Sequence, residues 1–188
     1  NLPKEQLEQI LDSAFLDVPQ PLQAPTQEVF DKYLYGLAVV PLNLTLTIIG
    51  ESKPSTSLKL AENLGRALMI TYILRDIKDD AKSGHLFIPT ELLQNANVSK
   101  ETPMSILEDK NLSSAREALS KDAQKCFVTA QRFLNKMNKK SVMSLFYLAN
   151  LSHCYFEQMN NRGWEIISPK PNINNIGKLK LIIKTLFA

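Results

Sequence analysis

The sequence predicts an all-α fold, a single-domain helical bundle, and three observations support it. Apolar side chains recur at three- and four-residue spacing through most of the chain. No segment shows the two-residue alternation of a half-buried strand, and prolines or glycines separate the periodic stretches. At 188 residues the chain is long enough to bury a hydrophobic core. We therefore expect one domain over residues 1–188.

The first predicted helix spans residues 2–16. Pro3 lies in its first turn, where proline is well tolerated. Its apolar residues follow helical spacing, which predicts one face packed against the rest of the bundle. The proline-rich segment 18–25 ends it.

The second predicted helix covers residues 27–49. Thr26 can cap its start, Pro41 is expected to bend it, and Gly50 ends it. Residues 34–50 carry no charge and approach the length of a membrane span. Their proline, glycine and polar residues favour a buried, kinked core helix over a membrane-spanning one.

A long helix follows the loop over residues 51–56. Ser57 is expected to cap it, and it runs to Lys82 with Gly84 just past its end. Its apolar residues lie on nearly every side, which is typical of a helix at the centre of a fold.

The remaining chain is predicted to be helical with one longer loop. A short helix spans residues 89–94, and a single helical turn lies near residues 104–107. Longer helices are expected over residues 113–137, 141–160 and 176–187.

Composition limits the classes of function. The formal net charge of +3 is small and dispersed, which argues against nucleic-acid binding. Cys126 and Cys154 lie in helical patterns without a CxxC pair, so neither a zinc site nor a disulfide is predicted. A cytoplasmic location fits this cysteine usage. The chain starts at Asn1 instead of Met, and we expect it to be part of a longer protein.

The long helix carries the candidate site. Asp76 and Asp80 are four residues apart, so their carboxylates leave the same helix face. Two like charges so placed are often explained by a cation between them, and Mg²⁺ suits carboxylates combined with substrate phosphates. The alternative is a solvated helix end in which Arg75 and Lys78 neutralise the acids.

The segment that contains these acids resembles a known family. Residues 65–81, GRALMITYILRDIKDDA, and 84–89, GHLFIP, look like the second aspartate-rich region of the squalene and phytoene synthase family. Residues 33–38, YLYGLA, and 161–166, NRGWEI, resemble two further motifs of that family. The greatest similarity is to the bacterial presqualene diphosphate synthases of hopanoid synthesis.

The resemblance implies a fold, a cofactor and site residues. It implies a helical bundle of the isoprenoid synthase type and Mg²⁺ held by Asp76 and Asp80. It also implies that Arg75 takes part in catalysis and, with Tyr35, contacts diphosphate. Further positions implied to bind substrate are Met69, Tyr72, Lys170 and Lys178. The family's first aspartate-rich motif precedes these segments, so we expect this chain to be the C-terminal portion.

The implied activity is a Mg²⁺-dependent, head-to-head condensation of two prenyl diphosphates, with farnesyl diphosphate as the expected substrate. Contact with the inner membrane is a further expectation, because the last helix combines lysines with apolar residues. The alternative is a catalytically inactive member that acts as an assembly factor, for example for respiratory complex I. Tyr72 replaces the family's Asn, Met69 its Gln, and residues 39–42 its small GTVG sequence, and these changes favour that alternative.

Overall fold

The computed structural model describes residues 3–50 and 54–187, except for the side chains of residues 184, 186 and 187. Within those residues the regular elements are helices, which confirms the all-α prediction. They are α1 (Lys4–Ala14), the 3₁₀ turn η1 (Phe15–Asp17), α2 (Gln27–Leu34), the π turn η2 (Tyr35–Val39), α3 (Val40–Ile49), α4 (Pro54–Lys82), α5 (Thr90–Asn95), α6 (Pro103–Ile106), α7 (Leu112–Leu134), α8 (Met143–Arg162) and α9 (Asn175–Phe187).

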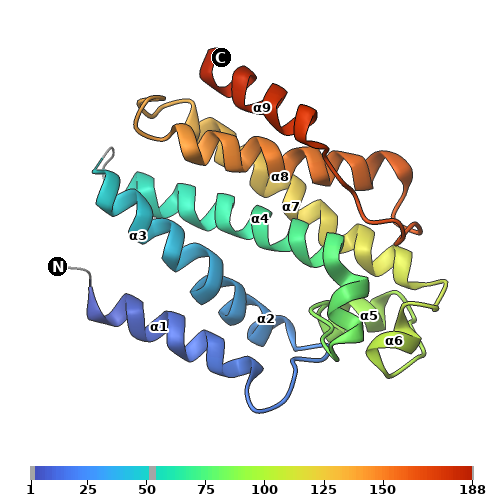
Figure 1. The fold of residues 1–188 in the computed structure, drawn as a ribbon. Coiled ribbons are helices and arrows are strands. Elements are labelled where there is room, and N and C mark those ends of the chain that lie inside the picture. Colours follow the sequence, from blue (N-terminus) through green and yellow to red (C-terminus); the bar gives the residue numbers. More distant parts are fainter. Residues whose placement is uncertain (1–2, 51–53, 188) are drawn as a thin grey trace.

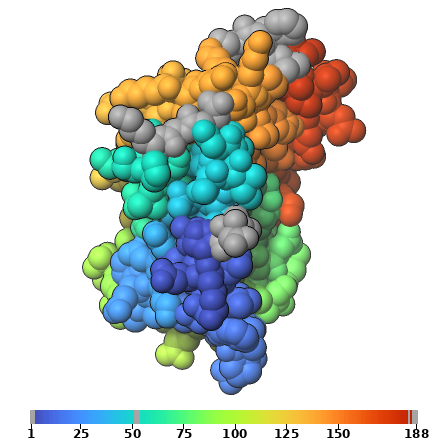
Figure 2. Space-filling model, turned by 90° about the vertical axis from the view of Figure 1, so that its left-hand side faces the viewer, coloured from blue at the N-terminus to red at the C-terminus, as the bar shows by residue number. Residues whose placement is uncertain are grey.

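Helix α4 runs through the middle of the bundle (Figure 1). Its most extensive contact is with α7, and it also packs against α3, η2 and α8. Helix α1 lies outside η2, and α9 lies outside α8, so these two helices form opposite outer layers. In the side view of Figure 2, the first helix (blue) and the α8 region (orange) lie at opposite ends of the visible face.

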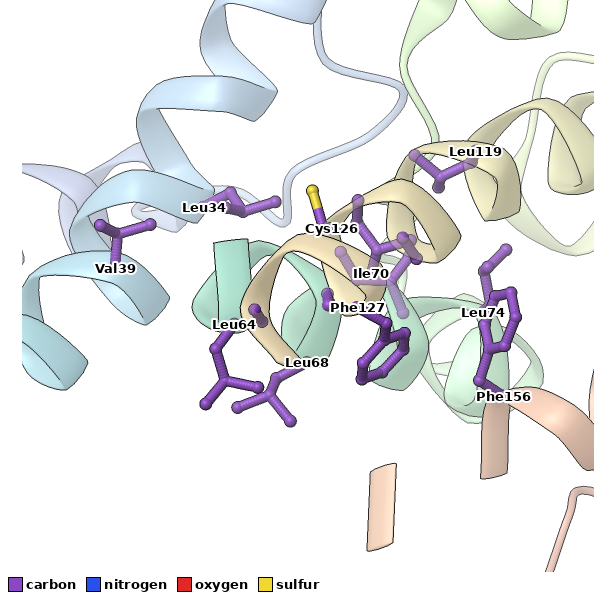
Figure 3. Packing of buried hydrophobic residues seen from close by; sticks show 14 of the residues in the cluster. Leu34, Val39, Leu64, Leu68, Ile70, Leu74, Leu119, Cys126, Phe127 and Phe156 are labelled. Carbon is purple, nitrogen blue, oxygen red and sulfur yellow. The ribbon is translucent and has the colours of Figure 1, made fainter. Parts of the chain in front are cut away.

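The central position of α4 follows from its composition. Leu60, Leu68 and Ile73 are buried although, at about 100° per residue, they point in widely different directions around the helix. Figure 3 shows this part of the core, where α4 side chains lie close to those of α7 such as Phe127. A helix that is apolar on most sides is stable only when other helices cover those sides.

The predicted second helix is divided into three consecutive segments. Thr26 caps α2, as predicted, because its side chain accepts a hydrogen bond from the Val29 amide. The π turn η2 then precedes Pro41, the second residue of α3. A proline ring clashes with the carbonyl four residues earlier, here that of Leu37 within the wider π turn. The irregularity predicted at Pro41 therefore lies just before it.

Residues 27–49 form the one helical stretch in the described chain that is long and apolar enough to cross a membrane. Buried core helices meet the same criteria of length and composition. Phe30, Leu34 and Val39 are almost fully buried against other helices of the bundle. This packing agrees with the predicted core helix.

The prediction that Ser57 caps the long helix is wrong. Helix α4 already begins at Pro54, and Ser57 is a buried residue within its first turns. Proline suits a first turn because the amide it lacks would have no helical partner there. Residues 51–53 of the predicted loop lie outside the described residues. Gly84 follows the end of α4 with φ +85°, as a left-handed terminator does.

Gly65 of α4 allows a close approach between α4 and η2. A Cβ atom at this position would lie 2.9 Å from both the carbonyl carbon and the carbonyl oxygen of Ala38. We expect Gly65→Ala to lower the free energy of unfolding by about 1–2 kcal/mol, because backbone crowding outweighs the roughly 1 kcal/mol gain in helix propensity. Denaturant unfolding measures this change. An equally or more stable variant would contradict it.

Candidate active site

Three acidic residues gather at the C-terminal end of α4. Arg75 donates from Nε and Nη2 to the carboxylate of its neighbour Asp76, at 3.0 and 2.6 Å. Lys170, from the segment between α8 and α9, donates to Asp76 Oδ1 at 3.3 Å and to Asp79 Oδ2 at 2.9 Å. Burial would raise the pKa of Asp76, but the hydrogen bonds and charges of Arg75 and Lys170 hold it below its usual value.

Two aromatic rings hold the Arg75 guanidinium in place. Its central carbon lies 4.6 Å from the ring centre of Tyr72 and 4.8 Å from that of Tyr155 on α8. A guanidinium stacked on aromatic faces is stabilised and loses conformational freedom. Arg75 is therefore a fixed cation that orients Asp76.

Asp80 is half-buried and differs from Asp76 in its surroundings. Its carboxylate accepts no hydrogen bond and forms no ion pair within residues 3–50 and 54–187. Burial and the negative charge of Asp76 raise its pKa from 3.8 to about 6. The nearby His85 pairs instead with Asp17, whose Oδ2 lies 3.1 Å from His85 Nε2.

The raised pKa of Asp80 predicts a pH dependence. The folded chain binds more protons than the unfolded chain between pH 3.8 and about 6, so stability falls as pH rises through this range. Above pH 6 the ionised carboxylate destabilises the fold, by about 1–2 kcal/mol after allowance for partial exposure. We expect Asp80→Asn to raise the denaturant midpoint at pH 7.5 and to leave it nearly unchanged at pH 4. An equal effect at both pH values would contradict this.

An open apolar hollow of about 420 Å³ lies along the part of α4 that precedes the acids, at residues 65–72. It is formed by η2 and α3, by α4 and by α8. Its lining includes Leu37, Leu42, Met69, Tyr72, Leu145 and Leu148. Asp76 and Asp80 do not line it; Tyr72, one turn before Asp76, stands between the hollow and the acids. The apolar hollow and the acidic residues thus follow one another along α4.

Of the other residues predicted to bind substrate, Lys170 contacts the acids. Tyr35 and Lys178 form no hydrogen bond or ion pair with them within the part of the chain that the structure describes. Tyr35 lies in η2 with 40% of its surface exposed, and Lys178 lies on α9. Sequence reasoning assigned no site role to Tyr155, whose ring stacks on Arg75. It also missed Asp17, because no local pattern joins this residue to His85.

The two carboxylates fit a magnesium ion. Mg²⁺ is commonly held by one or two carboxylates, with water and substrate phosphate as its other ligands. Asp80 has a half-buried carboxylate of raised pKa next to a second carboxylate, and a divalent cation would stabilise its ionised form. No cluster of three or more metal-ligating side chains occurs in the described part of the chain. Asp76 and Asp80 would therefore supply only part of the coordination.

Comparison with known proteins gives a consistent result. A family model described as squalene/phytoene synthase matches residues 1–175. Presqualene diphosphate synthases from Sinorhizobium fredii and Rhodopseudomonas palustris are 27% and 26% identical over 97% of this chain and 65% of their own length. The chain thus spans just under two thirds of the curated relatives that it matches.

Solved structures share the fold. A dehydrosqualene synthase in complex with a ligand aligns with a TM-score of 0.77 at 18% identity, over 99% of this chain and 65% of that structure. A squalene synthase from Alicyclobacillus acidocaldarius aligns with a TM-score of 0.75 at 18% identity, over 87% of this chain and 62% of that structure. The predicted isoprenoid synthase type of bundle is confirmed.

Proposed function

Because the chain belongs to the squalene/phytoene synthase family, we propose that it forms part of a prenyltransferase that joins two prenyl diphosphates head to head. Farnesyl diphosphate is the proposed substrate, pyrophosphate is released, and Mg²⁺ is the proposed cofactor. The presqualene diphosphate synthases among its relatives support this reaction. We extend the proposal to a role in hopanoid synthesis. The observation that carries the proposal is that Asp76 and Asp80 follow Tyr72, which lines an apolar hollow, by one and two turns of helix α4.

Each part of the site has a role in this reaction. Asp76 and Asp80 would hold Mg²⁺, which neutralises the charge that develops on the departing pyrophosphate. Arg75 keeps Asp76 oriented through its two hydrogen bonds. The apolar hollow would hold prenyl chains and keep water away from an allylic cation. Tyr72 lines the hollow and its ring stacks on the Arg75 guanidinium, so it would separate a bound prenyl chain from the charged groups.

We place the protein in the cytoplasm with peripheral contact to the inner membrane. Helix α9 supports this placement, because Ile176, Leu179 and Ile182 are exposed and three lysines but no acidic residue occur along the helix. Exposed apolar residues combined with lysines are typical of helices that lie on an anionic lipid surface.

A second candidate is a member of the family that has lost catalysis and acts as an assembly factor with a protein partner. The observation in its favour is that Arg75 and Lys170 already neutralise Asp76 within the chain. A carboxylate paired in this way is a weaker ligand for a metal than a free one.

Pyrophosphate release tests the proposal directly. Purified protein is incubated with farnesyl diphosphate, with and without Mg²⁺, and both pyrophosphate and prenyl products are measured. We expect release only with Mg²⁺. Binding of farnesyl diphosphate without any release would favour the second candidate, and absence of both binding and release would contradict the prenyltransferase.

A further inference from the structure

The segment between α8 and α9, residues 163–174, crosses the end of α4 and is held at several points; we call it the strap. Arg116 of α7 donates to the carbonyls of Trp164 and Ile166 within it. Lys78 donates to Ser168 Oγ at 3.0 Å, and Arg162 donates to the Pro169 carbonyl. These contacts place Lys170 next to the acids of α4.

The Lys170 ammonium lies between two carboxylates of α4. It is 3.3 Å from Asp76 Oδ1 and 2.9 Å from Asp79 Oδ2. Its side chain is 53% exposed, so solvent reaches it and the ion pairs can exchange with dissolved ions. Asp76 Oδ1 also accepts a hydrogen bond from Arg75 Nε.

This geometry places a protein cation where a metal would bind. A Mg²⁺ ion requires short contacts to its carboxylate ligands, about 2.0–2.1 Å, and an ammonium on the same oxygen repels it. Arg75 is fixed by two aromatic rings and a bidentate pair, whereas Lys170 sits on a flexible side chain. Lys170 is therefore the cation that can leave.

We propose that Lys170 is a tethered counter-ion that occupies the acids in the absence of metal and is displaced when a divalent cation binds Asp76 and Asp80. This inference rests on the proposed function and adds a regulatory step to the same site. Displacement frees the ammonium and loosens the strap from α4. The freed ammonium then lies near the metal, where it can pair with a negatively charged diphosphate.

Cation affinity tests the competition. Mn²⁺, a spectroscopic substitute for Mg²⁺, is titrated into the wild-type protein and into Lys170→Met at constant ionic strength, and free Mn²⁺ is measured by electron paramagnetic resonance. We expect Lys170→Met to bind Mn²⁺ about three- to tenfold more tightly than the wild type, because the half-exposed Lys170 ammonium no longer competes with the metal for Asp76. Lys170→Arg, which keeps the charge, is expected to bind within about twofold of wild type.

Lys82→Met is the matched control. Lys82 contacts Asp79 Oδ1 at 3.2 Å and is equally exposed, but it has no contact with Asp76. Its removal lowers the local positive charge by the same amount, and we expect less than a twofold change in affinity. An equal increase in Mn²⁺ affinity in Lys170→Met and Lys82→Met would overturn the inference. The increase would then come from the lower local positive charge and not from the loss of a specific competitor.

Hydrogen exchange tests the release of the strap. We expect saturating Mn²⁺ to speed amide exchange in residues 163–174 of the wild type, and Lys170→Met to show faster exchange without metal. Unchanged exchange in both cases would overturn the inference. Failure of the wild type and all variants to bind Mn²⁺ would instead overturn the metal site of the proposed function, so the two failures are distinguishable.

Discussion

Asp76→Asn is expected to lower kcat/KM for farnesyl diphosphate by about 10²- to 10⁴-fold at saturating Mg²⁺. The amide removes the negative charge that a divalent cation requires and leaves Arg75 without its bidentate partner. Loss of a metal that stabilises a leaving group costs several kcal/mol of transition-state energy. Steady-state kinetics with detection of pyrophosphate measures the effect.

The control for this prediction is Asp12→Asn, an exposed aspartate on α1 far along the chain from the site. It is expected to change kcat/KM by less than twofold. Circular dichroism and thermal unfolding of both variants show whether the fold is intact. Retention of more than a tenth of wild-type activity in Asp76→Asn would contradict a role for this carboxylate in metal binding.

Arg116→Met is expected to lower the free energy of unfolding by about 2–4 kcal/mol. Arg116 is only 1% exposed, and its guanidinium donates to the carbonyls of Leu74, Trp164 and Ile166. Burial lowers its pKa to about 10, and this value still leaves the side chain charged at neutral pH. Removal of this charged donor leaves three carbonyls without their partner. The free energy lost with these hydrogen bonds exceeds the free energy gained because a charge is no longer buried.

Arg132→Met provides the comparison, because Arg132 lies exposed on the same helix α7. Its removal is expected to change stability by no more than about 0.5 kcal/mol. Denaturant unfolding of the two variants measures the difference. A loss below about 1 kcal/mol in Arg116→Met would mean that water or neighbouring groups satisfy the three carbonyls.

Much of the fold is predictable because helical periodicity and helix ends are local properties. Thr26 and Gly84 act as predicted, since a cap or a left-handed terminator depends on the residue and its near neighbours. The start of α4 differs, because Pro54 and Ser57 both suit a helix start and only packing decides between them. The assignment of residues 1–188 to one domain stays a prediction.

The candidate site is predictable only in part. The spacing of Asp76 and Asp80 places them on one helix face without any knowledge of the fold. The partners that set their charge come from elsewhere: Tyr155 and Lys170 reach the end of α4 from segments about 80 and 90 residues further along the chain. No local pattern indicates such contacts. The roles of the site residues in metal and substrate binding therefore stay predictions.

The π turn η2 has a consequence for how the hollow could change over evolution. A π turn holds about one residue more than an α turn, and each residue of a helix turns its successors by about 100°. Pro41 and Leu42 line the hollow from just beyond this extra residue. Deletion of one residue in the turn would rotate α3 relative to the hollow. Pro41 and Leu42 would then no longer face the hollow, and side chains from a neighbouring face of α3 would line it instead. A single codon lost there would thus change the lining of the hollow without any amino-acid replacement.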